Sequence, residues 1–264
     1  CILIGLFVGF LVLLAINPAH AWADGFVRIL KGGFHDAPYG VGKELANAAP
    51  LIMTGLSVGF AFKTGLFNIG AAGQYTLGAY GALYCAIMLK LPWFVCLLAA
   101  AVLGGLWGAI PGFFKAYFNI NEVITSIMFN WIGLYLVNEL VYQNGTGPMY
   151  DVRNTRTLNL GKNADLAQSV IPDFGLNKLF QTNSTTIAIF LAAVVAILIW
   201  VVLNKTTFGY ELKAVGLNKS AARYAGINEK KNIILSMAIA GALAGFGAGL
   251  FYLSNVGQWN PLNS

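Results

Sequence analysis

The stretch Asn204–Asn232, NKTTFGYELKAVGLNKSAARYAGINEKKN, is a polar island between two long apolar runs, and the fold can be worked out from it. Its charged residues are mostly basic: Lys205, Lys213, Lys219, Arg223, Lys230 and Lys231, against Glu211 and Glu229. Lys and Arg resist translocation across a membrane, so they collect in the short cytoplasmic loops of membrane proteins. We therefore predict that this island is a cytoplasmic loop between two membrane spans.

A short helix is predicted within the island. Asn218 suits an N-cap, Ser220–Ala225 can form the helix, and Gly226 stands where a left-handed C-cap residue is expected. A short helix that two spans hold at the cytoplasmic face indicates a docking element for a cytoplasmic partner. The candidate docking residues are Asn218, Ser220, Ala221, Ala222, Arg223, Tyr224, Ala225 and Gly226. The alternative is an ordinary basic loop that only fixes topology.

The composition is that of an integral membrane protein. Of the 264 residues, 58% are hydrophobic and only 10% are charged, and the mean hydropathy is +0.69. Soluble domains carry about a quarter charged residues, so most of this chain faces lipid or the interior of a helix bundle. A net charge of +6 would suggest a nucleic-acid partner in a soluble protein, but membrane topology accounts for it here. We predict an all-α fold, a polytopic transmembrane helix bundle that binds no nucleic acid.

About seven spans are visible as apolar runs, so residues 1–264 read as a single transmembrane domain. The runs lie at 1–16, 45–62, 65–89, 93–114, 123–142, 186–203 and 233–253. Two runs carry glycines at four-residue spacing, which lets helix backbones pack closely: Gly104, Gly108 and Gly112, and Gly241, Gly245 and Gly249. If the segment 204–232 is cytoplasmic, Lys63 and Lys115 are also inside, and the polar loop 143–184 is outside.

The first part of the chain is expected to differ from a simple span. Within His20–Ala46, apolar residues at helical spacing predict an amphipathic helix at the membrane interface: Trp22, Phe26, Ile29 and Leu30. Lys31–Gly42 is rich in glycine and is predicted to be a turn. The apolar run begins directly at Cys1, and only a short tail follows the last run, so we expect a fragment of a longer protein.

Three polar residues lie in otherwise apolar surroundings. Asn68 and Gln74 fall in a glycine-rich interruption that follows Lys63, and Asn130 sits in the middle of the fifth run. Irregular backbone at membrane depth survives only where protein buries it or where it lines a watery cavity, so the interruption is a candidate for a translocation pathway. A tight cytoplasmic turn is the alternative. Asn130 is either a pathway residue or a hydrogen-bonded link between helices.

The sequence gives little support to catalysis or to ion coupling. It has no GxxxxGK[ST] phosphate loop, no metal-binding cysteine or histidine spacing, and no convergent set of nucleophile and base. An embedded enzyme is therefore disfavoured. An ion-gradient-driven carrier or channel commonly places acids within its spans, whereas Glu122 and Glu139 lie toward the ends of theirs.

Three motifs, taken in order, resemble the permease subunits of ABC importers in the branched-chain amino acid, ribose and nucleoside group. They are GLFNIGAAGQ (Gly65–Gln74), FNINEVITSIMFNWI (Phe118–Ile132) and FGYELKAVGLNKSAARYAGI (Phe208–Ile227). The second motif is most similar to the nucleoside branch, whose partner is a binding protein of the basic-membrane-lipoprotein type. The resemblance covers nearly the whole chain apart from its variable outer loops.

This resemblance implies a bacterial inner-membrane importer with several chains. Its other parts would be a second permease subunit, an extracytoplasmic substrate-binding lipoprotein and cytoplasmic ATPase subunits. ATP and Mg²⁺ would bind the ATPase, with no cofactor on this chain. In such importers a short cytoplasmic helix of the permease sits in a cleft of the ATPase, and Asn218–Gly226 matches it here. The implied cargo is a nucleoside, with branched-chain amino acids or sugars as alternatives.

Overall fold

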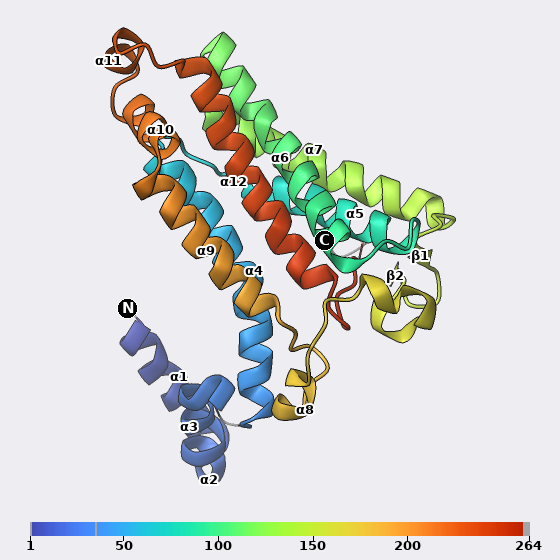
Figure 1. The fold of residues 1–264 in the computed structure, drawn as a ribbon. Helices are drawn as coiled ribbons and strands as arrows, with labels where there is room; N and C mark the ends of the chain where they lie inside the picture. The colour runs from blue at the N-terminus through green and yellow to red at the C-terminus, as the bar shows by residue number, and fades with distance from the viewer. Residues whose placement is uncertain (1, 35, 261–264) are drawn as a thin grey trace.

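The computed structural model describes residues 2–34 and 36–260 and is almost entirely helical (Figure 1). The longer helices are α4 (Tyr39–Lys63), α5 (Ala71–Ile87), α6 (Trp93–Phe118), α7 (Glu122–Tyr142), α9 (Ala188–Lys205) and α12 (Glu229–Tyr252). The shorter ones are α1 (Ile2–Ile16), α2 (Pro18–His20), α3 (Val27–Lys31), α8 (Leu176–Phe180), α10 (Thr207–Leu217) and α11 (Lys219–Tyr224). Strands β1 (Tyr150–Asp151) and β2 (Arg156–Thr157) pair antiparallel. The predicted all-α class is confirmed.

Within the described residues, five helices are long and apolar enough to cross a membrane, namely α4, α6, α7, α9 and α12. The other two predicted spans are helical but shorter, with 15 residues in α1 and 17 in α5. A straight crossing needs roughly 20 residues. The predicted third run began at residue 65, but residues 64–70 are not helical, so α5 starts only at Ala71. The polytopic bundle is therefore confirmed.

α12 is the central helix, and close glycine contacts hold it against its neighbours. A Cβ added at Gly104 of α6 would lie 2.5 Å from the carbonyl oxygen of Gly241, and one at Gly241 would lie 2.3 Å from that of Gly104. Gly78 of α5 approaches the same face, since its Cβ would lie 2.3 Å from the Cα of Gly245. The two predicted glycine stripes thus pack against each other, and α5 joins them.

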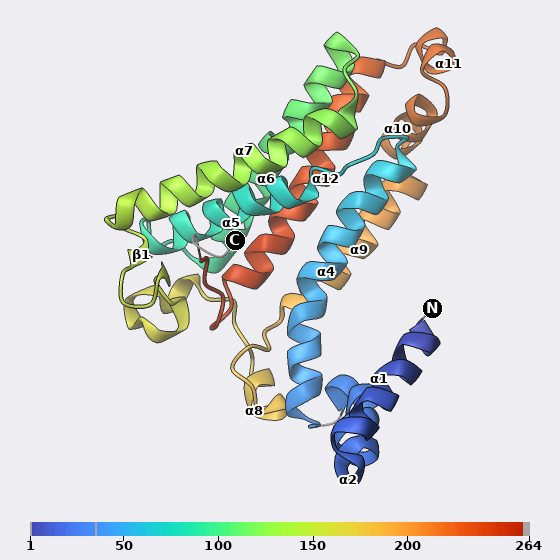
Figure 2. The same ribbon diagram turned by 180° about the vertical axis from the view of Figure 1, so that it is seen from behind.

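The first helices form a separate arm beside the bundle (Figures 1 and 2). Residues 18–31 fold as α2, a π-helical turn and α3, in place of one continuous amphipathic helix. They pack back on α1 through Phe10, whose ring centroid lies 5.6 Å from that of Trp22 and 4.9 Å from that of Phe26. α4 begins at Tyr39, earlier than the predicted start near Leu45, so the predicted turn is shorter than Lys31–Gly42.

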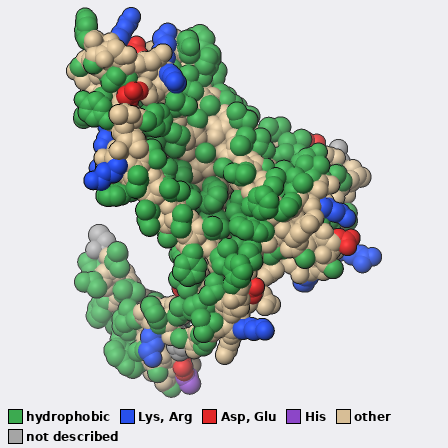
Figure 3. Space-filling view, viewed as in Figure 1, with side chains coloured by type: hydrophobic (Ala, Val, Ile, Leu, Met, Phe, Trp, Pro, Cys, Tyr) green, Lys and Arg blue, Asp and Glu red, His purple; other side chains and the backbone are tan. Residues whose placement is uncertain are grey.

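Basic side chains gather around α10 and α11 at one end of the bundle, here called the island end. Lys63 and Lys213 line one cavity there. Lys115 pairs with Glu122 at 2.8 Å, and Lys230 lies over the ring of Tyr117 at 4.5 Å. Figure 3 shows a group of Lys and Arg side chains at this end, separated by a hydrophobic band from the charged side chains at the opposite end. This distribution agrees with the predicted topology, in which Lys63, Lys115 and the island share one side.

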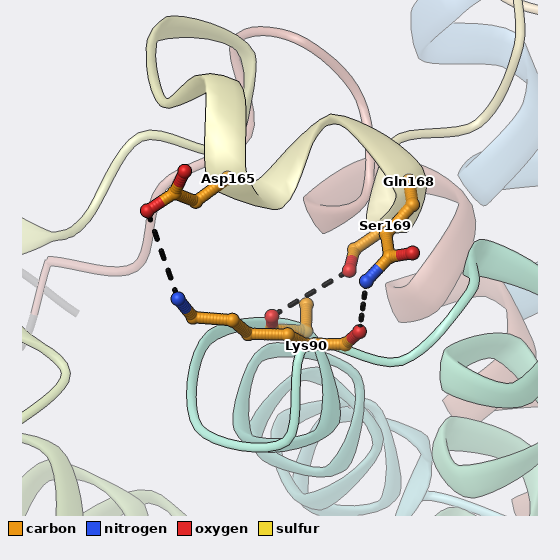
Figure 4. A network of polar contacts seen from close by, with 5 residues as sticks. Lys90, Asp165, Gln168 and Ser169 are labelled. Carbon is orange, nitrogen blue, oxygen red and sulfur yellow. Dashed lines mark hydrogen bonds and ion pairs between the residues drawn. The ribbon is translucent and has the colours of Figure 1, made fainter.

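Residues 143–172 form a compact layer at the opposite end, here called the loop end, and residues 173–184 run from it to the start of α4 (Figure 1). Figure 4 shows how the layer is fastened to the α5–α6 turn: the Ser169 hydroxyl donates to the Leu91 carbonyl at 2.6 Å, and the Gln168 amide donates to the Lys90 carbonyl. Lys90 also pairs with Asp165 at 3.7 Å.

The tail after α12 completes this layer. The Trp259 carbonyl accepts from the Thr157 amide at 2.9 Å, which extends the β1–β2 layer. The Trp259 indole N–H donates to the side-chain oxygen of Asn138 at 2.9 Å. The tail therefore ties the loop layer to the end of α7.

Candidate coupling surface and substrate pathway

α11 is capped at both ends as predicted. The Asn218 side-chain oxygen accepts from the Ala221 N–H at 3.0 Å, as expected of an N-cap. Gly226 has a φ of +83°, and its N–H donates to the Arg223 carbonyl at 3.0 Å. The Ile227 N–H donates to the Ala222 carbonyl, also at 3.0 Å. These last two bonds form a Schellman motif, which needs a left-handed residue at Gly226. The predicted helix is thus confirmed, displaced by one residue toward the N-terminus.

α11 projects from the island end and exposes most of its surface (Figure 1). Tyr224 is 94% exposed, and Leu217, just before the helix, is 89% exposed. Ala222 alone among the candidate docking residues is buried, at 4%. It belongs to a small cluster with Leu66, Val215, Ile233 and Met237. The exposed Tyr224 of α11, with the exposed Leu217 beside the helix, has the form of an interaction surface.

α10 connects this surface to the bundle, and the sequence analysis did not predict it. The Thr206 hydroxyl caps it by accepting from the Gly209 N–H at 3.1 Å. Near its other end, Gly216 touches the backbone that follows α4: a Cβ on Gly216 would lie 2.5 Å from the carbonyl carbon of Thr64. Gly65 has a φ of +71°, so the chain can turn there beneath α10.

The non-helical linker 64–70 runs from the island end to the middle of the bundle, where α5 begins (Figure 2). Two of the predicted pathway residues, Asn68 and Gln74, are buried here, with exposed fractions of 2% and 1%. Their side-chain amides exchange two hydrogen bonds, of 2.8 and 3.0 Å. Asn68 also donates to Ser57 at 3.3 Å, and Ser57 donates to the Ala240 carbonyl at 2.6 Å. This set of side chains, here called the plug, joins α4, α5 and α12.

Asn130, the third predicted pathway residue, holds the start of α5. Its side-chain oxygen accepts from the Gly73 N–H at 2.7 Å, and its amide donates to the Ile69 carbonyl at 2.9 Å. The N-cap residue of α5 is Gly70, which has no side chain to offer. α7 therefore supplies the missing acceptor from another helix. Of the two interpretations of Asn130, the structure shows the helix–helix hydrogen bond, although the side chain is only half-buried.

The structure also brings together polar residues that the sequence analysis did not single out. Asn47, Thr54 and Tyr75 line a cavity of about 430 Å³ between α4, α5 and α12. Asn47 lies near the start of a predicted span, where polar residues are common, and Tyr75 directly follows Gln74. The sequence position of neither residue therefore indicated a site. Among the described residues, no group of His, Cys, Asp or Glu side chains is arranged to hold a metal ion.

The fold defines a class: a membrane-embedded helix bundle with a short, exposed helix at one end. The sequence profile described as "Branched-chain amino acid transport system / permease component" matches residues 42–262, and the chain belongs to this family. It is thus a multi-pass membrane protein and the permease subunit of an ABC importer. The ion-gradient-driven alternative is not retained, because the relatives below are named as ABC transporter permeases.

Three relatives illustrate this membership. The guanosine ABC transporter permease protein NupP of Bacillus subtilis is 35% identical over 94% of this chain and 69% of its own length. The nucleoside ABC transporter permease protein NupB of Lactococcus lactis is 33% identical, over 96% and 70%. The glucose ABC transporter permease protein TsgB13 of Haloferax volcanii is 34% identical, over 93% and 64%. No solved structure matches significantly.

Proposed function

We propose that this chain is the permease subunit of an ATP-driven nucleoside importer and that α11 couples it to a separate cytoplasmic ATPase. Two of the relatives above are named for guanosine or nucleosides, which supports the cargo. In this proposal the island end is cytoplasmic, and the ATPase subunits hold ATP and Mg²⁺. An extracytoplasmic binding lipoprotein delivers the substrate at the loop end, and a second permease subunit, the same chain or a related one, completes the pathway.

The observation that carries the coupling proposal is the shape of α11. Both ends of the helix are capped, so its backbone is fixed without help from a partner. Arg223 and Tyr224 are exposed, and these residue types dominate the binding energy of protein interfaces. The single buried contact, through Ala222, leaves the helix free to present both side chains to a cleft in the ATPase.

In this proposal, ATPase movement reaches the substrate pathway through α10 and the linker 64–70. α11 follows α10 directly, and α10 touches residues 64–65 through backbone at Gly216. A Cβ on Gly216 would meet the backbone of Thr64, and a Cβ on Gly65 would meet the backbone of Gly216. Because the two backbones touch, a shift of α10 must displace the linker. The linker carries Asn68, whose hydrogen bonds close the plug. Closure of the ATPase dimer would thus pull on the plug from the cytoplasmic side.

The test is co-purification of the ATPase subunit with the tagged full-length permease in detergent. Replacing Arg223 and Tyr224 by alanine should weaken recovery of the ATPase about 30-fold, the equivalent of about 2 kcal/mol for an interface hot spot. Phe174→Ala is the matched control, because Phe174 is 81% exposed but lies at the loop end. Equal ATPase recovery with both variants, or none with the unaltered protein, would contradict the proposal.

A sugar importer is the second candidate, because the glucose permease is similar at nearly the same identity. Uptake of labelled guanosine should be reduced by excess uridine or adenosine and left unchanged by glucose or leucine. Inhibition by glucose alone would support the second candidate.

A further inference from the structure

Two neighbouring cavities lie between α4 and α12, on the side of the plug that faces the loop end. The first, of about 430 Å³, is lined by Asn47, Pro50, Leu51, Thr54, Tyr75 and Phe251. The second, of about 270 Å³, also has Asn47 and Phe251 in its wall. Small-molecule pockets in proteins have volumes of roughly 300–1,000 Å³. The first cavity is therefore large enough for a ligand the size of a nucleoside.

Two polar side chains in the wall of the first cavity are left without a hydrogen-bond partner among the described residues, whereas the Thr54 hydroxyl donates to the Pro50 and Leu51 carbonyls. Neither the Asn47 amide nor the Tyr75 hydroxyl makes a hydrogen bond within the part of the chain that the structure describes, and Asn47 is exposed. Ala46 lines the second cavity. In a helix its carbonyl would accept from the N–H of residue 50, but Pro50 has no N–H to donate. Unpaired polar groups are costly against lipid, so this face is built to meet water or a ligand.

The position of the cavity relative to the plug suits a substrate that has entered from the loop end. Gln74 and Tyr75 are neighbours in α5, but Gln74 is 1% exposed and belongs to the plug, whereas Tyr75 lines the cavity. α4 runs from the loop end to the island end, and Asn47 lies eight residues from its start. The cavity thus lies toward the loop end of the bundle.

We propose that Asn47, Tyr75 and Phe251 form a binding subsite for a nucleoside toward the loop end of the bundle, a proposal that rests on the proposed function. The Tyr75 and Phe251 rings offer faces on which a base can stack, and the Asn47 amide offers one acceptor and two donors for a base edge or a ribose hydroxyl. The first cavity has no charged residue in its wall, so it is poorly suited to the zwitterion of an amino acid.

The test is chemical labelling of Asn47→Cys in the full-length transporter, with all other cysteines replaced by serine. A water-soluble thiol reagent added from outside should modify this cysteine. The half-protecting concentration of guanosine is the one that halves the rate of labelling. At ten times this concentration, guanosine should slow the labelling about tenfold, as expected for simple site occupancy. Ribose and leucine at the same concentration should protect far less. Arg153→Cys, on the exposed surface of the loop end, is the control that should react without protection.

Two further variants test whether a nucleoside base stacks on the Tyr75 ring or whether Tyr75 has only a structural role. In the Asn47→Cys protein, Tyr75→Phe keeps the ring but loses the hydroxyl, so it should raise the half-protecting guanosine concentration less than loss of the ring does. Tyr75→Leu removes the ring and should raise that concentration about tenfold, within the range measured for stacking on one base. An unreactive Asn47→Cys, labelling that guanosine does not slow, or equal protection by ribose would overturn the proposal. Co-purification of the ATPase tests α11 and not this cavity, so it reports separately on the proposed function.

Discussion

Gly245 lies where α5, α6 and α12 meet, and its missing side chain decides how close the three helices come. A Cβ at this position would lie 2.3 Å from the carbonyl oxygen of Ala100, which belongs to a helix backbone and cannot move aside. We expect Gly245→Ala to separate the helices and to lower the melting temperature in detergent by several degrees, for an overpacking cost of about 1–3 kcal/mol. Gly9→Ala is the control, because open space surrounds Gly9 in α1. An unchanged melting temperature for Gly245→Ala would contradict this packing.

Asn130 allows the structural and transport roles of a polar residue to be told apart. Asn130→Ala leaves the Gly73 N–H without its acceptor, which should cost about 1–2 kcal/mol of stability. Asn130→Asp keeps the acceptor and should recover part of that loss. The measurement is the melting temperature of each variant together with its nucleoside uptake. If Asn130→Ala melted like the unaltered protein and yet lost uptake, Asn130 would act on the substrate and not on α5.

Local rules predicted single residues well where the interaction is local. The Asn218 cap and the left-handed Gly226 follow from residues within one helical turn, and both are confirmed. The partners of Asn68, Gln74 and Asn130 could not be predicted in this way. Asn130 bonds to residues 57 and 61 positions away, and Ser57 bonds to Ala240. Polarity within an apolar run showed that these side chains need partners, but only the packing of α4, α5, α7 and α12 supplies them.

At the scale of elements, the charge pattern of the sequence did not predict the helix α10. The basic residues of 204–232 predicted a loop, but the segment also contains regularly spaced apolar residues. Gly209, Leu212 and Val215 recur every three residues, and all three are buried. This spacing is the signal that could have predicted a helix lying against the end of the bundle.

The contact between α10 and the linker makes a prediction about coupling. A side chain at Gly216 would press on the backbone of residues 64–65, so Gly216→Val should displace the linker without touching the exposed face of α11. We expect the ATPase to co-purify normally while nucleoside uptake per ATP hydrolysed falls at least about tenfold, as for a coupling energy of about 1.4 kcal/mol. The measurement is uptake and ATP hydrolysis in the same proteoliposomes. Gly9→Ala serves as the control, and an unchanged ratio would show that α10 does not transmit the motion through this contact.

At the scale of the whole molecule, the order of spans was predictable and the loop layer was not. Apolar runs and glycine spacing are properties of neighbouring residues, so they predicted the helices and a close backbone contact at the glycines of α6 and of α12, but not that the two helices are partners. Residues 143–184 have no regular periodicity, and their fold depends on distant partners. Thr157 binds residue 259, and Ser169 binds residue 91. Such contacts cannot be read from the segment itself.

The orientation of the whole bundle in the membrane underlies every proposal above, and it can be tested directly. The island end carries Lys63, Lys115 and the charges of 204–232, so the positive-inside rule places Arg223 in the cytoplasm and Asn154 outside. In intact cells, a membrane-impermeant thiol reagent should modify Asn154→Cys and leave Arg223→Cys unmodified. In inside-out vesicles the pattern should reverse. Both positions are exposed, so burial cannot explain a failure to react. Labelling of Arg223→Cys in intact cells would place α11 outside, out of reach of a cytoplasmic ATPase.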